Sequence, residues 1–200
     1  MNAPKPPRGR PALPDERRDA ILDAALACFV TQGFHGTAVP EISRRAGIAT
    51  GTLYHYFPSK EAIVNALFRK WKEAIGARVL TAFPPGVTVR EQFSAVWRTM
   101  ADFALNHPEA FAFLELHHHR PYLDADSLAM ENRLKEFGAT MVSAAQAEGV
   151  IKQGSTTLLM ELAFGAFNGM MRAHYEGRLV LTDELRRLAE EACWDIVAAR

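Results

Sequence analysis

The chain of 200 residues is long enough for one domain of ordinary size with a smaller unit attached, and too short for a large multidomain enzyme. Hydrophobic residues make up 48% of it and charged residues 23%, which excludes a disordered composition and indicates a sizeable core. No apolar stretch reaches the roughly 18 residues that span a bilayer, and the first residues lack a hydrophobic signal core. Cys28 and Cys193 form no CxxC pair. We therefore expect a cytoplasmic protein without membrane contact, disulfide framework or zinc finger.

Charge is balanced over the whole chain but not along it. Residues 1–72 carry 11 basic and 6 acidic side chains, a net charge of +5, whereas residues 73–200 carry 12 basic and 17 acidic side chains, a net charge of −5. Such an asymmetry suggests that the basic end meets a polyanion such as nucleic acid, although a solvated charged surface explains many imbalances of this size.

The first part of the chain predicts a basic arm followed by three helices. Residues 1–14 hold five of the eleven prolines, so we expect an extended, mobile arm. Asp15 is suited to cap a first helix whose apolar residues follow 3.6-residue spacing up to a stop at Gly33. A second, short helix should begin near Pro40 and stop at Gly47, and a third should span residues 50–57.

Six further helices are predicted in the remainder. Ser59 is suited to cap a long helix over residues 59–82, in which apolar residues recur every four positions from Ile63 to Val79. No stretch alternates strictly between apolar and polar residues as a half-buried strand does, so the sequence predicts an all-α fold. The other five helices are expected at residues 88–106, 109–119, 126–148, 156–176 and 183–198.

Two short helices joined by the tight turn Ala46-Gly47-Ile48-Ala49, preceded by an amphipathic helix, have the layout of a helix-turn-helix unit. The stretch from Gly33-Phe34 through Thr37-Ala38-Val39-Pro40-Glu41-Ile42-Ser43-Arg44-Arg45, this turn and Thr50-Gly51-Thr52-Leu53-Tyr54-His55-Tyr56-Phe57-Pro58-Ser59-Lys60-Glu61-Ala62 closely resembles the DNA-binding domain of TetR-family transcriptional regulators. The resemblance is close over about residues 15–70 and consists of helix number and length beyond them.

This resemblance implies the domain organisation of a TetR-like regulator with nine helices. After the arm at residues 1–14, it implies a helix-turn-helix domain over residues 15–60 and an effector-binding and dimerisation domain over residues 61–200, linked through the helix at 59–82. It implies a regulator and not an enzyme, without a cofactor. Its implied partners are double-stranded DNA with a palindromic operator, a second copy of the chain and an unknown small-molecule effector.

The resemblance also assigns DNA-binding roles, and the residue types suit them because a recognition helix presents small or polar groups to base edges and donors to phosphates. Gly51 has no side chain and would allow close backbone approach. Ala49 stands where Ser is common, so Thr50 could instead cap the helix. The residues expected to bind DNA are Thr37, Arg44, Arg45, Thr50, Gly51, Thr52, Tyr54, His55 and Lys60, together with Arg8 and Arg10 of the arm.

Lys60 and the arm each have an ordinary alternative. Lys60 lies in the first turn of a predicted helix, where the macrodipole disfavours a cation by up to ~1 kcal/mol unless an anion such as phosphate is bound. The alternative is a solvated surface lysine. Arg8-Gly9-Arg10-Pro11 is similar to the minor-groove clasp of AT-hook proteins, and the alternative is an unstructured tail that adds salt-dependent affinity only.

The second half is expected to supply a ligand pocket and a dimer interface, both implied by the resemblance. The pocket is expected between residues 88 and 148 and the following helix, although apolar stripes at helical spacing are core more often than pocket. Its expected lining is Phe93, Trp97, Met100, Phe103, Phe111, Phe113, Leu114, His118, Met130, Phe137, Met141 and Phe167. The helices at 156–176 and 183–198 are expected to form a four-helix interface through Leu158, Leu159, Leu162, Ala166, Phe167, Met170 and Trp194.

The run His117-His118-His119 raises the possibility of a metal site, because imidazole is a common zinc ligand. Adjacent residues on a helix point about 100° apart, so we expect no metal there and interpret the run as a pocket wall or helix C-terminus. The function expected from the sequence is a homodimeric repressor released from a palindromic operator by a largely apolar effector, with activation left open. Two alternatives are an all-α enzyme using Glu115 and His118, and an architectural DNA binder without ligand control.

Overall fold

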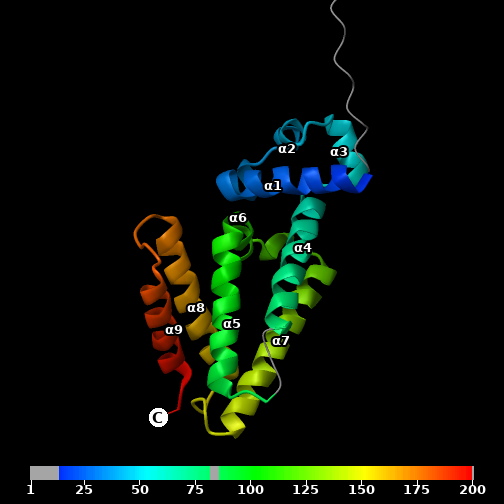
Figure 1. Cartoon of the computed structure of the whole chain (residues 1–200). Helices are drawn as coiled ribbons and strands as arrows, with labels where there is room; N and C mark the ends of the chain where they lie inside the picture. The colour runs from blue at the N-terminus through cyan, green and yellow to red at the C-terminus, as the bar shows by residue number, and fades with distance from the viewer. Residues whose placement is uncertain (1–13, 82–85, 200) are drawn as a thin grey trace, which may run out of the picture. The chain divides into compact units, whose positions relative to one another are not determined.

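The computed structural model describes residues 14–81 and 86–199 (Figure 1). The arm expected at residues 1–14, with Arg8 and Arg10, lies outside the described residues except for Pro14. Within the described ranges the chain forms nine α-helices and no strand, which confirms the all-α prediction. The helices are α1 (Pro14–Gly36), α2 (Val39–Arg45), α3 (Thr50–Tyr56), α4 (Lys60–Thr81), α5 (Val89–Asn106), α6 (Pro108–Phe111), α7 (Ala125–Ala147), α8 (Thr156–Tyr175) and α9 (Asp183–Val197).

The chain divides into two compact units, one ending at Ile63 and the other beginning at Val64, and each is described by itself. In the first unit, α1 buries an apolar face against α2 and α3. That face carries Ile21, Leu22, Ala25, Leu26 and Phe29, and it meets Ile42 of α2 and Leu53 and Phe57 of the α3 segment in one buried core.

Two glycines with positive φ shape the first unit. Gly33 has φ 68° and ψ 176°, so the predicted stop of the first helix is a sharp break, after which one further helical turn runs to Gly36. Gly47 has φ 69° and makes the tight turn between α2 and α3, a conformation that glycine adopts without steric cost. The expected cap at Asp15 is wrong, because α1 already includes Pro14 and Asp15 lies within its first turn.

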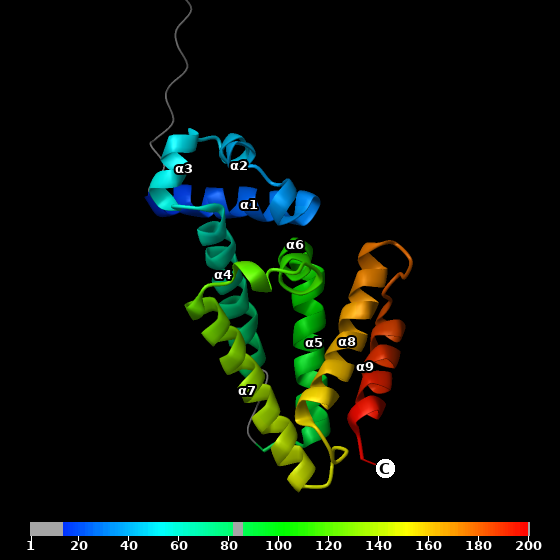
Figure 2. The ribbon, with the colours of Figure 1, turned by 180° about the vertical axis from the view of Figure 1, so that it is seen from behind.

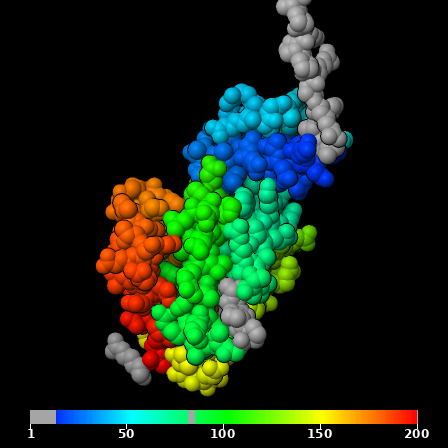
Figure 3. Space-filling model, viewed as in Figure 1, coloured from blue at the N-terminus to red at the C-terminus, as the bar shows by residue number. Residues whose placement is uncertain are grey.

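In the second unit, side-chain caps define where most of the long helices begin. Thr88 forms a capping box with Glu91 at α5, and Asp124, Ser155 and Thr182 each accept a backbone N–H at α7, α8 and α9. Helices α8 and α9 lie side by side in both ribbon views, with α5 next to α8 (Figure 2). They lie at the edge of this unit in the space-filling view (Figure 3).

The predicted helix at 109–119 is wrong over its last three residues. After α6, a π-helical turn spans Ala112–Leu116, and His117 is already extended with φ −108° and ψ 143°. Histidine is a modest helix former, so three in succession favour an early end, and the helix ends before the histidine run. A 3₁₀ turn, Arg120–Tyr122, then leads to α7.

No described helix has the length and apolar character needed to cross a bilayer. Cys28 and Cys193 are both buried and are free thiols. Burial raises the pKa of the Cys28 and Cys193 thiols, which keeps them protonated at neutral pH.

Candidate nucleic-acid interface and ligand-binding unit

Helix α3 is anchored on one side and exposed on the other. Leu53 is fully buried and Phe57 nearly so, which fixes the helix on the core of the first unit. Gly51 and His55 are exposed, and Tyr54 is 49% exposed. Residues three and four apart share one helix face, so Gly51, Tyr54 and His55 present a common exposed surface. This surface is a glycine backbone flanked by a phenol and an imidazole.

The threonines at the start of α3 are not used as caps. The N-cap residue is Ala49, whose carbonyl oxygen accepts the backbone N–H groups of Thr52 at 2.9 Å and Leu53 at 3.2 Å. The alternative in which Thr50 caps the helix is therefore wrong, since Thr50 is already its first helical residue. Thr50 and Thr52 are both half-buried, at the margin of the exposed α3 surface.

Thr37 does not fit its expected role as a phosphate contact. Its side chain is 2% exposed, and its hydroxyl donates its one hydrogen to the carbonyl oxygen of Gly33 at 2.7 Å. The backbone N–H of Thr37 donates to the same oxygen at 3.2 Å. Thr37 thus closes the broken end of α1, and its hydroxyl has no hydrogen left for a phosphate.

Lys60 is similarly engaged inside the first unit. Its Nζ donates to the carbonyl oxygen of Phe34 at 2.5 Å and to that of Thr37 at 2.9 Å, and it lies 4.2 Å from the centre of the Phe34 ring. Carbonyls at a helix end lack intrahelical donors, so they attract a cation. The expected cap beside Lys60 is confirmed, because Ser59 Oγ accepts the backbone N–H of Ala62 at 3.2 Å.

Arg44 and Arg45 share one carboxylate on α2. Arg44 donates to Glu41 through Nε at 2.8 Å and Nη2 at 2.6 Å, and Arg45 Nε lies 3.4 Å from the same carboxylate. The hydrogen bonds from Arg44 hold the pKa of Glu41 below its ordinary value. The two arginines and one carboxylate therefore carry a net charge of about +1 at neutral pH.

Sequence reasoning missed Arg17 of α1. A hollow of about 440 Å³ lies between the start of α1 and the α2–α3 turn, and Arg17 lines it together with Thr52. In the sequence, Arg17 is only one basic residue in a helix predicted from its apolar spacing, so nothing marked it as a candidate. The full lining is Glu16, Arg17, Ala20, Ala46, Gly47, Ile48, Ala49 and Thr52.

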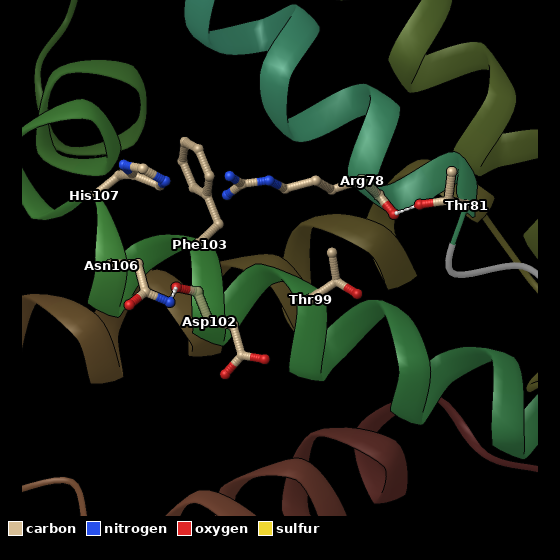
Figure 4. Close-up of a pocket in the computed structure, with 7 residues that line it drawn as sticks. All are labelled: Arg78, Thr81, Thr99, Asp102, Phe103, Asn106 and His107. Carbon is tan, nitrogen blue, oxygen red and sulfur yellow. Dashed lines mark hydrogen bonds between the residues drawn. The ribbon is translucent and has the colours of Figure 1, made fainter.

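In the second unit, a groove of about 510 Å³ lies between α4 and α5 (Figure 4). The Arg78 guanidinium extends from α4 toward the Phe103 ring on α5 and lies 5.6 Å from its centre, with His107 beyond it. Asp102, at the edge of the groove, is 3.5 Å from Arg186 of α9. Of the expected pocket residues, only Phe103 is among those lining this groove, which are Arg78, Thr81, Thr99, Asp102, Phe103, Asn106 and His107.

Several other expected pocket residues pack against one another. Trp97 meets Phe167 edge-on at 4.8 Å between ring centres and stacks on Phe93 at 6.2 Å, while Phe111 lies 5.8 Å from Phe167. Leu114 is buried as well, whereas Met100 on α5 and Met130, Phe137 and Met141 on α7 are half-buried. The aromatic residues of α5, α6 and α8 therefore form a packed core cluster, and their role as a ligand pocket stays a prediction.

The histidine run behaves differently from what its sequence suggested. His118 is exposed, so its expected place in a pocket wall is wrong for this conformation, and His119 is the buried member, 4.0 Å from the Phe113 ring centre. Neither ring nitrogen of His119 has a hydrogen-bond partner among the described residues. Burial, assisted by His117, lowers the pKa of His119 to about 4. Among the described residues, no three side chains of His, Cys, Asp or Glu are placed so that they could hold a metal ion together.

The residues expected at a dimer interface fall into two sets. Leu158, Leu162 and Ala166 are exposed and Met170 is half-buried along one face of α8. Leu159 and Phe167 are instead buried within the unit, and Trp194 packs on Phe93 at 5.3 Å. Helical spacing puts residues 158, 162 and 166 on one face, whereas 159 and 167 are turned from it by about 100° on average, toward the rest of the unit. The list made from the sequence had merged the two sets.

Two models of known protein families match consecutive parts of the chain. The family described as "Bacterial regulatory proteins, tetR family" matches residues 21–67, and the family described as "Tetracyclin repressor-like, C-terminal domain" matches residues 68–199. The second match alone covers more than half of the chain.

Curated relatives match mainly the N-terminal part. The "HTH-type transcriptional repressor KstR2" of Mycolicibacterium smegmatis is 33% identical over 101 residues, 50% of this chain and 48% of the relative. The "HTH-type transcriptional regulator RutR" of Escherichia coli is 46% identical over 54 residues, 27% of this chain and 26% of the relative. The matched region thus spans about half the length of these relatives or less.

Solved structures match over nearly the full chain. A TetR-family regulator from Marinobacter aquaeolei has a TM-score of 0.82 and 28% identity, covering 93% of this chain and 97% of that one. A regulator from Shewanella described as putative has a TM-score of 0.79 and 28% identity, covering 92% and 99%. The arrangement of helices is therefore shared from the helix-turn-helix to the C-terminal helices.

Proposed function

Because the chain belongs to the TetR family of DNA-binding transcriptional regulators, we propose that it is a homodimeric repressor released from a palindromic operator by a small effector. DNA binding is assigned to the first unit, and effector binding and dimerisation to the second. The observation that carries the DNA-binding assignment is the anchored helix α3, which buries Leu53 and exposes Gly51, Tyr54 and His55. The KstR2 relatives are named as transcriptional repressors, which favours repression over activation.

The sequence-reading role is tested by selecting bound sequences from a random duplex pool. We expect a palindrome, because a single short recognition helix reads too few base pairs and a two-fold dimer places two of them about 34 Å apart. Tyr54→Ala should abolish the enrichment. Arg133→Ala, which changes an exposed residue of α7 away from the proposed dimer interface, is the control and should leave it intact. Failure of the unaltered protein to enrich any sequence would contradict the proposal.

Dimerisation is assigned to the outer face of α8 and α9. Leu158 and Leu162 of α8 and Leu188 of α9 are each about half exposed, an apolar surface of the kind that marks interaction sites. A side chain added at Gly165 or Gly169 would meet no other residue of the unit, so a second copy has room to approach α8 closely there.

Light scattering at micromolar concentration should give twice the chain mass of 22.2 kDa. Leu158→Glu with Leu162→Glu should give the monomer, because burying two carboxylates from each copy, four in all, between the copies is unfavourable. Leu80→Glu changes an equally exposed leucine of α4 and should leave the dimer intact. A monomeric unaltered protein, or equal loss of the dimer in both variants, would contradict the assignment.

Effector control is assigned to the second unit. Its groove between α4 and α5 has the volume of an ordinary small-molecule site. Helix α4 contributes residues to both units, so a ligand that shifts α4 is able to change the separation of two DNA-binding units in a dimer. A saturating effector from a ligand screen should weaken operator binding, and an unchanged operator affinity would contradict this part of the proposal.

Nothing in the structure favours the enzymatic alternative. Glu115 is paired with Lys72 at 2.7 Å with both side chains largely buried, and His118 is exposed. The carboxylate proposed as an acid or base is therefore already neutralised by a lysine.

A further inference from the structure

The outer surface of α2 holds two cations and one anion in a fixed arrangement. Arg44 is 71% exposed, whereas the Glu41 carboxylate that binds it is 29% exposed. Both Arg44 bonds are 2.8 Å or shorter and end on different oxygens of Glu41, which is the bidentate geometry of a strong guanidinium–carboxylate pair. Arg45 approaches the same carboxylate at 3.4 Å.

The backbone of Glu41 is fixed independently of the two arginines, and its negative charge is favoured at this position. It lies in the first turn of α2, where a negative charge is favoured by the helix dipole, and its backbone N–H donates to the Ala38 carbonyl oxygen at 3.0 Å. A carboxylate and a phosphate are recognised by a guanidinium with the same two-pronged geometry. Glu41 therefore occupies Arg44 in the way that a DNA phosphate would.

We propose that Glu41 competes with DNA phosphates for Arg44 and Arg45, and so limits the affinity of this regulator for DNA of arbitrary sequence. Phosphate contacts supply most of the affinity for non-specific DNA, because each neutralised phosphate releases counterions. Arginines held by an internal carboxylate contribute little to the affinity for non-specific DNA. The protein then depends on the exposed α3 surface for tight binding, which favours its operator over other sequences.

The inference rests on the proposed DNA-contacting role of the α2–α3 region, and it predicts a coupling between residues that ordinary surface electrostatics lacks. Removing a negative charge from any position near DNA raises the affinity for DNA somewhat, and this general effect also applies to Glu41. Competition requires more than this, because the gain must depend on the presence of Arg44 and Arg45. A double-mutant cycle separates the two effects.

The experiment measures binding of the full chain to a random-sequence duplex of about 30 base pairs, enough for two half-sites, by fluorescence anisotropy over a range of salt concentrations. Glu41→Gln should tighten binding about 5- to 10-fold at ~0.1 M salt and steepen the slope of log affinity against log salt by about one to two. Arg44→Gln with Arg45→Gln should change binding less than about 2-fold. Adding Glu41→Gln to that double variant should give little further gain.

Two controls keep the result specific. Glu136→Gln makes the same change in net charge at an exposed position of α7, outside the proposed interfaces, and should leave binding to the duplex unchanged. Thermal unfolding of each variant should give a cooperative transition, which confirms that the helix-turn-helix is intact.

Three outcomes would overturn the inference. An equal gain from Glu41→Gln with and without the arginines would assign the effect to general electrostatics. A large loss of binding from the arginine double variant alone would show that Glu41 does not withhold them. Failure of the unaltered protein to bind any duplex would overturn the proposed DNA-binding function itself, and Glu41 competition with it.

Discussion

The Lys60 ammonium lies 2.5 Å from the carbonyl oxygen of Phe34 and joins the start of α4 to the end of α1. Lys60 donates a second hydrogen bond to the Thr37 carbonyl oxygen, and its ammonium also lies 4.2 Å from the centre of the Phe34 ring. Two of its three N–H groups are therefore used by carbonyl oxygens. The position that the sequence marks as a phosphate ligand is thus a structural tie inside the first unit.

Lys60→Gln should therefore destabilise the protein more than it weakens phosphate contacts. Loss of two hydrogen bonds from a cation to partly buried carbonyls should lower the free energy of unfolding by about 2 kcal/mol, measured by urea unfolding. The salt dependence of DNA binding should stay as in the unaltered protein. Lys135→Gln, which removes an exposed lysine paired with Glu131, should change neither quantity. A salt slope reduced by about one with unchanged stability would restore Lys60 as a phosphate ligand.

Thr37→Val tests the same region with a nearly isosteric change. The valine keeps the volume but loses the hydroxyl that donates to the Gly33 carbonyl oxygen, so the free energy of unfolding should fall by about 1 kcal/mol. Thr37→Ser keeps the donor and should retain most of the stability. DNA affinity measured well below the unfolding transition should be the same for all three proteins. A selective loss of affinity in the valine variant would instead show a direct contact with DNA.

The sequence predicted this fold well where local chemistry and packing agree. Apolar spacing located the buried faces of α1 and α4, and Gly47 marked the α2–α3 turn. The phosphate-binding roles expected for Thr37 and Lys60 stay predictions, and the sequence did not reveal the internal hydrogen bonds of these two side chains. A hydroxyl or an ammonium has the same chemistry toward a phosphate as toward a backbone carbonyl, and the break at Gly33 supplies carbonyls that no residue pattern reveals.

The second unit shows a similar limit. Periodicity identified α8 as rich in apolar residues, but assigning Leu158 to the surface and Leu159 to the core requires the neighbouring helices. The histidine run was placed on a helix, and the early end of that helix reversed which histidine is buried. Pocket residues were the least predictable, because aromatic residues that fill a core and those that line a cavity follow the same spacing.

Gly51→Ala should separate stability from DNA binding. Gly51 is an exposed helical residue, and an added Cβ would meet no atom of the protein within 4 Å. Alanine should therefore raise the free energy of unfolding by about 0.5–1 kcal/mol. If the α3 backbone approaches DNA at this position, operator affinity should fall at least 10-fold despite the gain. Ser143→Ala, an exposed change on α7, is the control and should give a smaller gain in stability with unchanged operator affinity. Unchanged operator affinity in Gly51→Ala would show that this face of α3 does not contact DNA.

His119 should make stability depend on pH in mildly acidic solution. Burial lowers the pKa of His119 from an ordinary value of 6.5 to about 4. Between pH 4 and pH 6.5 the imidazole is therefore protonated in the unfolded chain and neutral in the folded chain. The free energy of unfolding therefore has its full value, as far as His119 is concerned, above about pH 6.5. It falls by a total of about 3 kcal/mol as the pH decreases toward 4. His119→Phe keeps an aromatic ring beside Phe113 and should flatten this part of the stability profile in urea unfolding. His118→Phe, at the exposed neighbour, should leave the profile unchanged, and the same slope in all three proteins would show that carboxylates alone cause the acid sensitivity.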